Sequence, residues 1–206
     1  MPERHLILGG ARSGKTNHAI TLATSRAAAR GEHVVYVATA QALDDEMRHR
    51  IDRHRAQRPM SWQTVEAPDR LAAALRAQSP AILLVDCLTL WLSNALLLDF
   101  DEATPTATLR RWDEERAAFL QWLGEYRGVA LLVSNEVGSG IVPASALARR
   151  FQDEQGWLNQ EVAAMCDSVT LVVAGIAVPM KGEQPAKVTP FDGDCRKGLG
   201  RFRPEE

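Results

Sequence analysis

Short apolar runs alternate with longer stretches of helical periodicity along most of this chain. The runs predict β-strands, and they cover His5–Leu8, His33–Ala38, Ile82–Asp86, Val129–Ser134 and Val169–Ala174, with a further short strand at Trp62–Glu66. The stretches between them predict helices, and they cover Lys15–Ala29, Leu43–Arg55, Asp69–Ala77, Leu88–Leu98, Thr108–Tyr126 and Ser145–Cys166. Strands that alternate with helices build a parallel sheet, so we predict an α/β fold with a mainly parallel sheet and helices on both faces.

The pattern changes twice in the second half of the chain. Pro105 is expected in a loop before the helix Thr108–Tyr126, whose apolar face is interrupted at Arg116. Residues 182–206 are rich in Gly, Pro, Lys and Glu and lack apolar periodicity. We therefore predict one domain over residues 1–181 and a flexible tail over residues 182–206.

Composition narrows the classes of protein. Of the 206 residues, 46% are hydrophobic and 24% charged, as in an ordinary soluble domain. The net charge of −2 argues against whole-chain attraction to nucleic acid, so any anion site must be local. The three cysteines have no metal-ligand spacing, which favours a reducing compartment. Polar residues interrupt the most apolar stretch, Ala81–Phe100, and we see no signal-peptide pattern, so we expect a soluble cytoplasmic protein without stable membrane insertion.

The most informative motif is Gly9-Gly-Ala-Arg-Ser-Gly-Lys-Thr16, which fits the phosphate-loop pattern G-x-x-x-x-G-K-[ST]. It follows a predicted strand and opens a predicted helix, as the chemistry requires. Glycines let successive backbone N–H groups face a phosphate, and the helix N-terminus adds positive potential. Lys15 can reach the β- and γ-phosphates, and Thr16 can ligate Mg²⁺.

Asp86 ends the apolar run of the third long strand. A carboxylate at the carboxyl end of a central strand can hold Mg²⁺ opposite a phosphate loop. The alternative is that Asp86 caps the helix that begins at Leu88. The motifs to this point leave a small-molecule kinase, an ATPase motor and a regulatory switch open, although a GTPase-type Asn-Lys-x-Asp motif is absent and the chain is short for a motor.

A basic, histidine-containing helix follows the strand His33–Ala38. Its residues Leu43, Met47 and Ile51 are four apart and predict a buried stripe. Glu46, Arg50 and His54 are also four apart and form a neighbouring row. Oppositely charged side chains also lie four apart, which is typical of a solvated helix.

The chemistry of His54 offers a second interpretation. Neighbouring arginines favour the neutral imidazole that a nucleophile needs, and they could also neutralise nucleotide phosphates. His49 is the competing candidate, although its pairing with Asp45 favours a structural role. The residues alone leave both interpretations open.

Taken together, the motifs resemble one enzyme family. They are Gly9-Gly-Ala-Arg-Ser-Gly-Lys-Thr16, Tyr36-Val-Ala-Thr-Ala40, Leu43-Asp-Asp-Glu-Met47, Arg50-Ile-x-x-His54, Leu84-Val-Asp-Cys-Leu-Thr-Leu-Trp-Leu-Ser-Asn94 and Ser134-Asn-Glu-Val-Gly-Ser-Gly-Ile-Val-Pro143. In this order, over about residues 4 to 181, they resemble the bifunctional adenosylcobinamide kinase / adenosylcobinamide-phosphate guanylyltransferase family of cobalamin synthesis. The resemblance implies a RecA-like P-loop domain, usually a homotrimer.

The resemblance also implies two reactions. The family phosphorylates adenosylcobinamide with ATP or GTP. It then transfers GMP from GTP, through a guanylylated histidine that matches His54, to give adenosylcobinamide-GDP and pyrophosphate. A corrinoid is thus the expected substrate and Mg²⁺ the expected cofactor, with Thr16 and Asp86 as its ligands; some relatives carry Glu at position 86.

The implied site residues comprise the catalytic His54 and Lys15 and a set of nucleotide contacts. The contacts match Gly9, Gly10, Ala11, Arg12, Ser13, Gly14, Lys15, Thr16, Thr39, Ala40, Gln41, Arg55, Ala56, Gln57, Arg58, Glu66 and Asp86. We also expect Asn135 and Glu136 to border the cleft, with loop capping beside Gly138 and Gly140 as the alternative. Two other hypotheses stay open: a kinase with His54 on a solvated helix, and a nucleotide-binding module without turnover.

Overall fold

The computed structural model describes residues 1–56, 58–78, 81–98 and 105–182, whose strands form one seven-stranded sheet. The strands are β1 (Glu3–Gly9), β2 (Val34–Ala38), β3 (Gln63–Glu66), β4 (Ile82–Asp86), β5 (Val129–Asn135), β6 (Ser168–Val173) and β7 (Ile176–Lys181). Their order is β3-β2-β4-β5-β1-β6-β7. All neighbours pair in parallel except β6 and β7, which are antiparallel.

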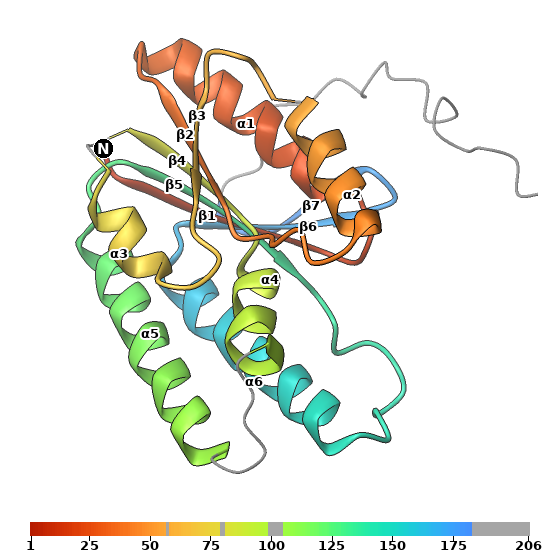
Figure 1. The fold of residues 1–206 in the computed structure, drawn as a ribbon. Helices are drawn as coiled ribbons and strands as arrows, with labels where there is room; N and C mark the ends of the chain where they lie inside the picture. The colour runs from red at the N-terminus through yellow and green to blue at the C-terminus, as the bar shows by residue number, and fades with distance from the viewer. Residues whose placement is uncertain (57, 79–80, 99–104, 183–206) are drawn as a thin grey trace, which may run out of the picture.

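Helices cover both faces of this sheet. They are α1 (Lys15–Arg30), α2 (Asp45–Ala56), α3 (Leu71–Arg76), α4 (Leu88–Ser93), the π-helix η1 (Asn94–Leu98), α5 (Pro105–Glu125) and α6 (Ala146–Met165). Figure 1 shows α1 and α2 on one side of the sheet and α3, α4, α5 and α6 on the other. The predicted α/β fold is confirmed, and β5 lies between β1 and β4 as in a RecA-like P-loop domain.

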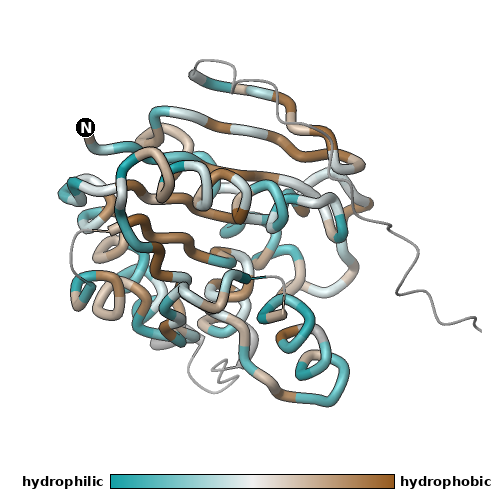
Figure 2. The backbone as a smooth tube through the Cα atoms, turned by 90° about the horizontal axis from the view of Figure 1, so that it is seen from above, coloured by the Kyte–Doolittle hydropathy of each residue, from teal (hydrophilic) through white to brown (hydrophobic). Residues whose placement is uncertain are grey.

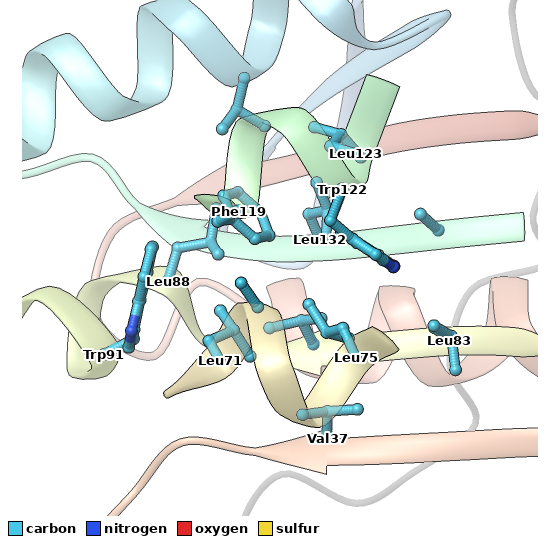
Figure 3. Packing of buried hydrophobic residues seen from close by; sticks show 14 of the residues in the cluster. Val37, Leu71, Leu75, Leu83, Leu88, Trp91, Phe119, Trp122, Leu123 and Leu132 are labelled. Carbon is cyan, nitrogen blue, oxygen red and sulfur yellow. The ribbon is translucent and has the colours of Figure 1, made fainter. Parts of the chain in front are cut away.

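The alternation of side chains along the inner strands builds a separate core on each face. Leu6 of β1 belongs to the core under α3, α4, α5 and α6, whereas its neighbour Ile7 belongs to the core under α1. Inner strands are therefore apolar on both sides, and they are brown in Figure 2. Figure 3 shows the larger core, where Phe119 and Trp122 of α5 lie over Leu132 of β5.

The structure corrects two predicted helix boundaries, at Pro105 and after Ser93, and explains the interruption at Arg116. Pro105 does not lie in a loop but is the first residue of α5, a position where a proline's missing N–H breaks no hydrogen bond. Arg116 interrupts the apolar face of α5 because it pairs with Glu154 and Glu161 of α6, at 3.8 and 3.6 Å. The helix expected over Leu88–Leu98 becomes a π-helix after Ser93.

The strand β7 is absent from the prediction. It is joined to β6 by the two-residue turn Ala174–Gly175, in which both residues have positive φ, as a tight hairpin requires. Residues 183–206 lie outside the described residues, so the division into a domain and a tail stays a prediction.

Two further observations concern only the described residues. None of their helices is long and apolar enough to cross a bilayer. Cys87 and Cys166 are buried free thiols, whereas Cys195 lies outside the described residues.

A buried threonine holds the carboxyl ends of β2 and β4 together. The Thr39 hydroxyl donates to the carbonyl oxygen of Cys87 at 2.7 Å and accepts from the Cys87 N–H at 2.8 Å. The Thr39 side chain is fully buried, so no water can replace these bonds.

We predict that Thr39→Val lowers the free energy of unfolding by about 1–3 kcal/mol, because it leaves the buried Cys87 N–H without an acceptor. The Cys87 carbonyl loses one of two donors and keeps the Trp91 N–H at 3.2 Å. Urea denaturation measures this change. The control is Thr24→Val, whose hydroxyl donates to the Ile20 carbonyl on the exposed side of α1 and whose loss should cost under about 0.5 kcal/mol. Equal effects of the two substitutions would contradict the proposed role of Thr39.

A buried histidine links stability to pH. Burial, aided by His18, lowers the pKa of His5 from 6.5 to about 4, and burial also lowers the pKa of His18. The unfolded chain therefore binds more protons than the folded chain between about pH 6.5 and 4. This contribution to stability is complete above pH 6.5 and is lost as the pH falls through that window.

We predict that His5→Gln flattens the decrease in unfolding free energy between about pH 6.5 and 4, by up to about 3 kcal/mol. Urea denaturation across this pH range measures the slope. The control variant His33→Gln changes an exposed histidine and should keep the wild-type slope. A wild-type slope in His5→Gln would show that another group carries the acid sensitivity.

Candidate active site

One cavity of about 670 Å³ opens at the carboxyl ends of the parallel strands, within the range typical of ligand sites. It combines the phosphate loop, the ends of β2, β3, β4 and β5, and one side of α2. Its lining residues are Arg12, Ser13, Gly14, Lys15, Thr16, Asn17, Tyr36, Ala38, Ala40, Ala42, Glu46, Met47, Ile51, Arg53, His54, Arg55, Arg58, Thr64, Glu66, Asp86, Cys87, Leu90 and Asn135.

The phosphate loop has the shape that its glycines predict. A Cβ on Gly9 would lie 2.5 Å from the Val172 carbonyl oxygen, so only glycine fits there. Gly14 has φ of 95°, which favours glycine, and it directly precedes the first turn of α1. The N–H of Gly175, in the β6–β7 turn, donates to the Ser13 carbonyl at 2.8 Å. The hairpin that the sequence did not reveal therefore supports the loop from outside.

Lys15, Thr16 and Asp86 line the same part of the cavity. The Lys15 ammonium donates to the Gly10 carbonyl at 3.1 Å, and the Thr16 hydroxyl donates to Asp86 Oδ1 at 3.5 Å. Asp86 does not cap α4, since the N-cap is Cys87 and no side chain caps that helix. The carboxylate is instead directed at the phosphate loop.

The donor atoms at this point fit Mg²⁺. Thr16 Oγ1 and Asp86 Oδ1 are neighbouring oxygens from α1 and β4, and oxygen is the ligand type that Mg²⁺ prefers. The described residues contain no cluster of three His, Cys, Asp or Glu side chains that could hold a metal. A site with few protein ligands is typical of Mg²⁺ that is bound together with nucleotide phosphates and water.

Tyr36 and Arg58 form a second group beside Asp86. The Tyr36 hydroxyl donates a short hydrogen bond to Asp86 Oδ2, and the Arg58 guanidinium carbon lies 3.3 Å from the centroid of the Tyr36 ring. Burial and the Asp86 charge raise the pKa of Tyr36 well above 10, so the phenol stays protonated. Burial, and next Asp86, also raise the pKa of Cys87 to about 11, so this thiol is not a nucleophile at neutral pH.

The helix α2 presents Met47, Ile51 and His54 to the cavity, at a spacing that places them on one side of the helix. The predicted stripe was wrong in two respects. Leu43 lies before the helix and is 63% exposed, and Met47 and Ile51 are half-buried against the cavity rather than packed in either core. His54 is also half-buried, whereas His49 is exposed and does not line the cavity.

The cavity gathers most of the predicted nucleotide contacts, although not all. The residues that line it are Arg12, Ser13, Gly14, Lys15, Thr16, Ala40, Arg55, Arg58, Glu66 and Asp86, together with His54. Those that do not line it are Gly9, Gly10, Ala11, Thr39, Gln41 and Ala56. Gln57 and the side chain of Arg50 lie outside the described residues.

Asn135 and Glu136 separate into different roles. Asn135 lines the cavity at the end of β5, and its side-chain oxygen is buried without a hydrogen-bond donor among the described residues. Glu136 is exposed, and its carboxylate accepts from the Gly138 N–H at 2.6 Å. Asn135 thus borders the cleft, whereas Glu136 caps the loop.

Sequence reasoning gave no site role to Tyr36, Met47 or Ile51. Tyr36 is a polar aromatic residue in a strand that is otherwise aliphatic, two residues before the end of β2. That position was the available signal, because side chains near the carboxyl end of a parallel strand reach the ligand edge of the sheet.

Known proteins match this chain over nearly the whole described domain. The family model described as cobinamide kinase / cobinamide phosphate guanyltransferase matches residues 5–180. The bifunctional adenosylcobalamin biosynthesis protein CobP of Pseudomonas aeruginosa is 53% identical over 182 residues, which cover 87% of this chain and 98% of that protein. The CobU protein of Escherichia coli, which has the same description, is 40% identical over 85% of this chain and 98% of its own length.

One solved structure, an ATPase domain, is more distantly similar. It is 12% identical, with a TM-score of 0.47, and the match covers 82% of this chain and 68% of that one. The family model and the curated relatives span the phosphate loop, the α2 histidine and the end of β5. The chain therefore belongs to the cobinamide kinase / cobinamide phosphate guanyltransferase family.

Proposed function

We propose that this chain phosphorylates adenosylcobinamide with ATP or GTP and then converts the product to adenosylcobinamide-GDP through a guanylylated His54. One observation carries the proposal beyond the family membership: the phosphate loop, Asp86 and His54 line a single cavity. A nucleotide bound there can meet both the phosphate loop and the histidine.

Charge in the cavity favours a nucleotide. Its lining holds five cationic side chains, those of Arg12, Lys15, Arg53, Arg55 and Arg58, against the carboxylates of Glu46, Glu66 and Asp86. The local balance is positive although the whole chain has a net charge of −2. A triphosphate gains from this local field, because a cleft focuses the potential of its own charges.

The kinase step needs the acceptor hydroxyl in line with the γ-phosphorus. The backbone N–H groups of the phosphate loop hold the phosphates, and Lys15 leaves the Gly10 carbonyl to contact the β- and γ-phosphates. The hydroxyl oxygen bonds to the γ-phosphorus, the bond from that phosphorus to the bridging oxygen breaks, and the nucleoside diphosphate leaves. The hydroxyl proton passes to solvent. Mg²⁺ held by Thr16 and Asp86 would neutralise charge on the phosphates.

The guanylyl step needs a different alignment of GTP in the same cavity. The lone pair of a neutral His54 nitrogen forms a bond to the α-phosphorus, and the bond to the pyrophosphate oxygen breaks. An oxygen of the cobinamide phosphate then bonds to the same phosphorus, and the P–N bond breaks and returns the electron pair to His54. Two displacements replace one difficult transfer, which is the general advantage of covalent catalysis.

The oligomeric state and the cellular location are two further proposals. We propose a homotrimer from the family resemblance, and the exposed apolar side chains of Ile176, Val178 and Met180 on the edge strand β7 favour a subunit contact. Function in the cytoplasm stays a prediction from the sequence.

The trimer predicts that sedimentation velocity gives about three times the chain mass of 22.7 kDa. Val178→Lys should shift the sample toward monomer, because a buried charge without a partner opposes association. An unchanged trimer would remove β7 from the contact, and a monomeric wild type would remove the trimer.

We predict that the wild-type chain with α-labelled GTP and Mg²⁺ gives an acid-labile, alkali-stable adduct, as a phosphoramidate does. His54→Ala should reduce labelling at least about 100-fold, because the nucleophile is lost. The same variant should keep at least part of the kinase activity, since the phosphate loop is intact. His49→Ala, which changes an exposed histidine of the same helix, should label as wild type. Full labelling of His54→Ala would end the assignment.

Lys15→Ala supplies the reciprocal comparison. It should abolish phosphorylation of cobinamide, because the phosphate-loop motif places this lysine on the β- and γ-phosphates. A kinase that works equally well without Lys15 would contradict the phosphate-loop assignment. Phosphorylated cobinamide without further conversion by the wild type would identify a kinase alone.

A further inference from the structure

Tyr36 contacts both Asp86 and Arg58, through its hydroxyl and its ring respectively. The tyrosine is 1% exposed and belongs to β2, on the face covered by α1. Asp86 lies on the phosphate-loop wall of the cavity, whereas Arg58 follows α2 on the histidine wall. One rigid ring therefore joins the two walls.

The hydroxyl of Tyr36 fixes one half of the Asp86 carboxylate. Oδ2 accepts from Tyr36, while Oδ1 accepts from Thr16 at 3.5 Å. A carboxylate held at both oxygens has one orientation, and Oδ1 is the oxygen beside Thr16 that would ligate Mg²⁺.

The ring of Tyr36 fixes Arg58. The guanidinium stacks on the ring, and Arg58 Nη1 donates to the Thr64 hydroxyl at 3.5 Å. The Nε–H group of Arg58 is buried and has no acceptor among the described residues. A stacked guanidinium with an unused donor, in the wall of a nucleotide cavity, is prepared to receive a phosphate oxygen.

We propose that Tyr36 is a positioning residue for both half-reactions: its hydroxyl orients Asp86 for Mg²⁺, and its ring holds Arg58 against the nucleotide phosphates. The inference rests on the proposed function and assigns separate parts of one side chain to the two walls. The hydroxyl effect should depend on Mg²⁺, and the ring effect should not.

Two substitutions separate these parts. Tyr36→Phe removes the hydroxyl and keeps the ring, whereas Tyr36→Leu removes both. The chain offers a matched control in Tyr126, its only other tyrosine, whose hydroxyl donates to the Ala81 carbonyl at 2.7 Å, away from the cavity. Tyr126→Phe reports what the loss of a hydrogen-bonded, half-buried phenol hydroxyl does to the fold alone.

The measurement is the dissociation constant of a non-hydrolysable GTP analogue, in Mg²⁺ and in EDTA, by isothermal titration calorimetry. Mg²⁺ should tighten binding to the wild type. Tyr36→Phe should lose about tenfold of that gain and keep the wild-type affinity in EDTA, because one hydrogen bond to a charged group is lost. Tyr36→Leu should lose the same gain and also bind about tenfold more weakly in EDTA. Arg58→Ala should match only the EDTA loss.

A purely structural role predicts a different result. If Tyr36→Phe lowers affinity equally in Mg²⁺ and EDTA, or if it binds as wild type in both, the hydroxyl does not position Asp86. If Tyr36→Leu binds as Tyr36→Phe in EDTA, the ring does not hold Arg58. Thermal unfolding of all variants, compared with Tyr126→Phe, shows whether a loss of affinity follows a loss of fold.

A failure of the proposed function can be distinguished from a failure of the positioning role of Tyr36. The wild type would then bind the analogue without guanylylation or phosphate transfer, and the two Tyr36 variants would still report on Mg²⁺ and Arg58.

As a second readout, Tyr36→Phe should raise the Mg²⁺ concentration that gives half-maximal kinase rate by about tenfold. It should leave the rate at saturating Mg²⁺ closer to wild type. A lowered rate at every Mg²⁺ concentration would overturn the positioning role.

Discussion

The parallel pairing of β1, β5 and β4 is the constraint on which the rest of the site depends. These strands run in the same direction and in continuous register. The phosphate loop, Asn135 and Asp86 therefore all lie at the carboxyl ends of the strands, on one side of the sheet. Each strand is buried on both faces, which fixes its register through packing rather than through the site residues themselves. The positions of Thr16 and Asp86 are thus consequences of two hydrophobic cores.

The same edge concentrates charge in a chain that is almost neutral overall. Arginines from the phosphate loop and from α2 face one cavity, while the acidic residues of the chain are distributed more widely. The proposed nucleotide would neutralise this excess, whereas a nucleic acid would meet a slightly anionic surface elsewhere. Recognition of a small polyanion is therefore compatible with a net charge that disfavours large ones.

The sequence predicted the elements that have strong periodicity. The parallel strands, the phosphate loop and the long helices follow from apolar patterns and from the spacing of Gly9, Gly14 and Lys15. What it could not predict depends on contacts between distant segments. The stacking of Arg58 on Tyr36 and the burial of Thr39 behind the site require the three-dimensional arrangement of β2, β4 and the segment after α2. The edge strand β7 was not predicted: Ile176, Val178 and Met180 alternate, but Pro179 interrupts the run, as is tolerated only in an edge strand.

The two walls of the cavity differ in how they are anchored. The phosphate-loop wall is tied to the sheet through Thr39, Cys87 and the β6–β7 turn. By contrast, none of the described side chains of α2 belongs to either core. A helix with so little packing can tilt at small energetic cost, while the stacking of Arg58 on Tyr36 keeps the segment after it attached to the opposite wall. The cavity thus has one rigid wall and one movable wall, and the movable wall carries His54. In the proposed mechanism, one position of α2 would align the γ-phosphorus of the bound triphosphate for the kinase step. Another position would align the α-phosphorus with His54 for the guanylyl step.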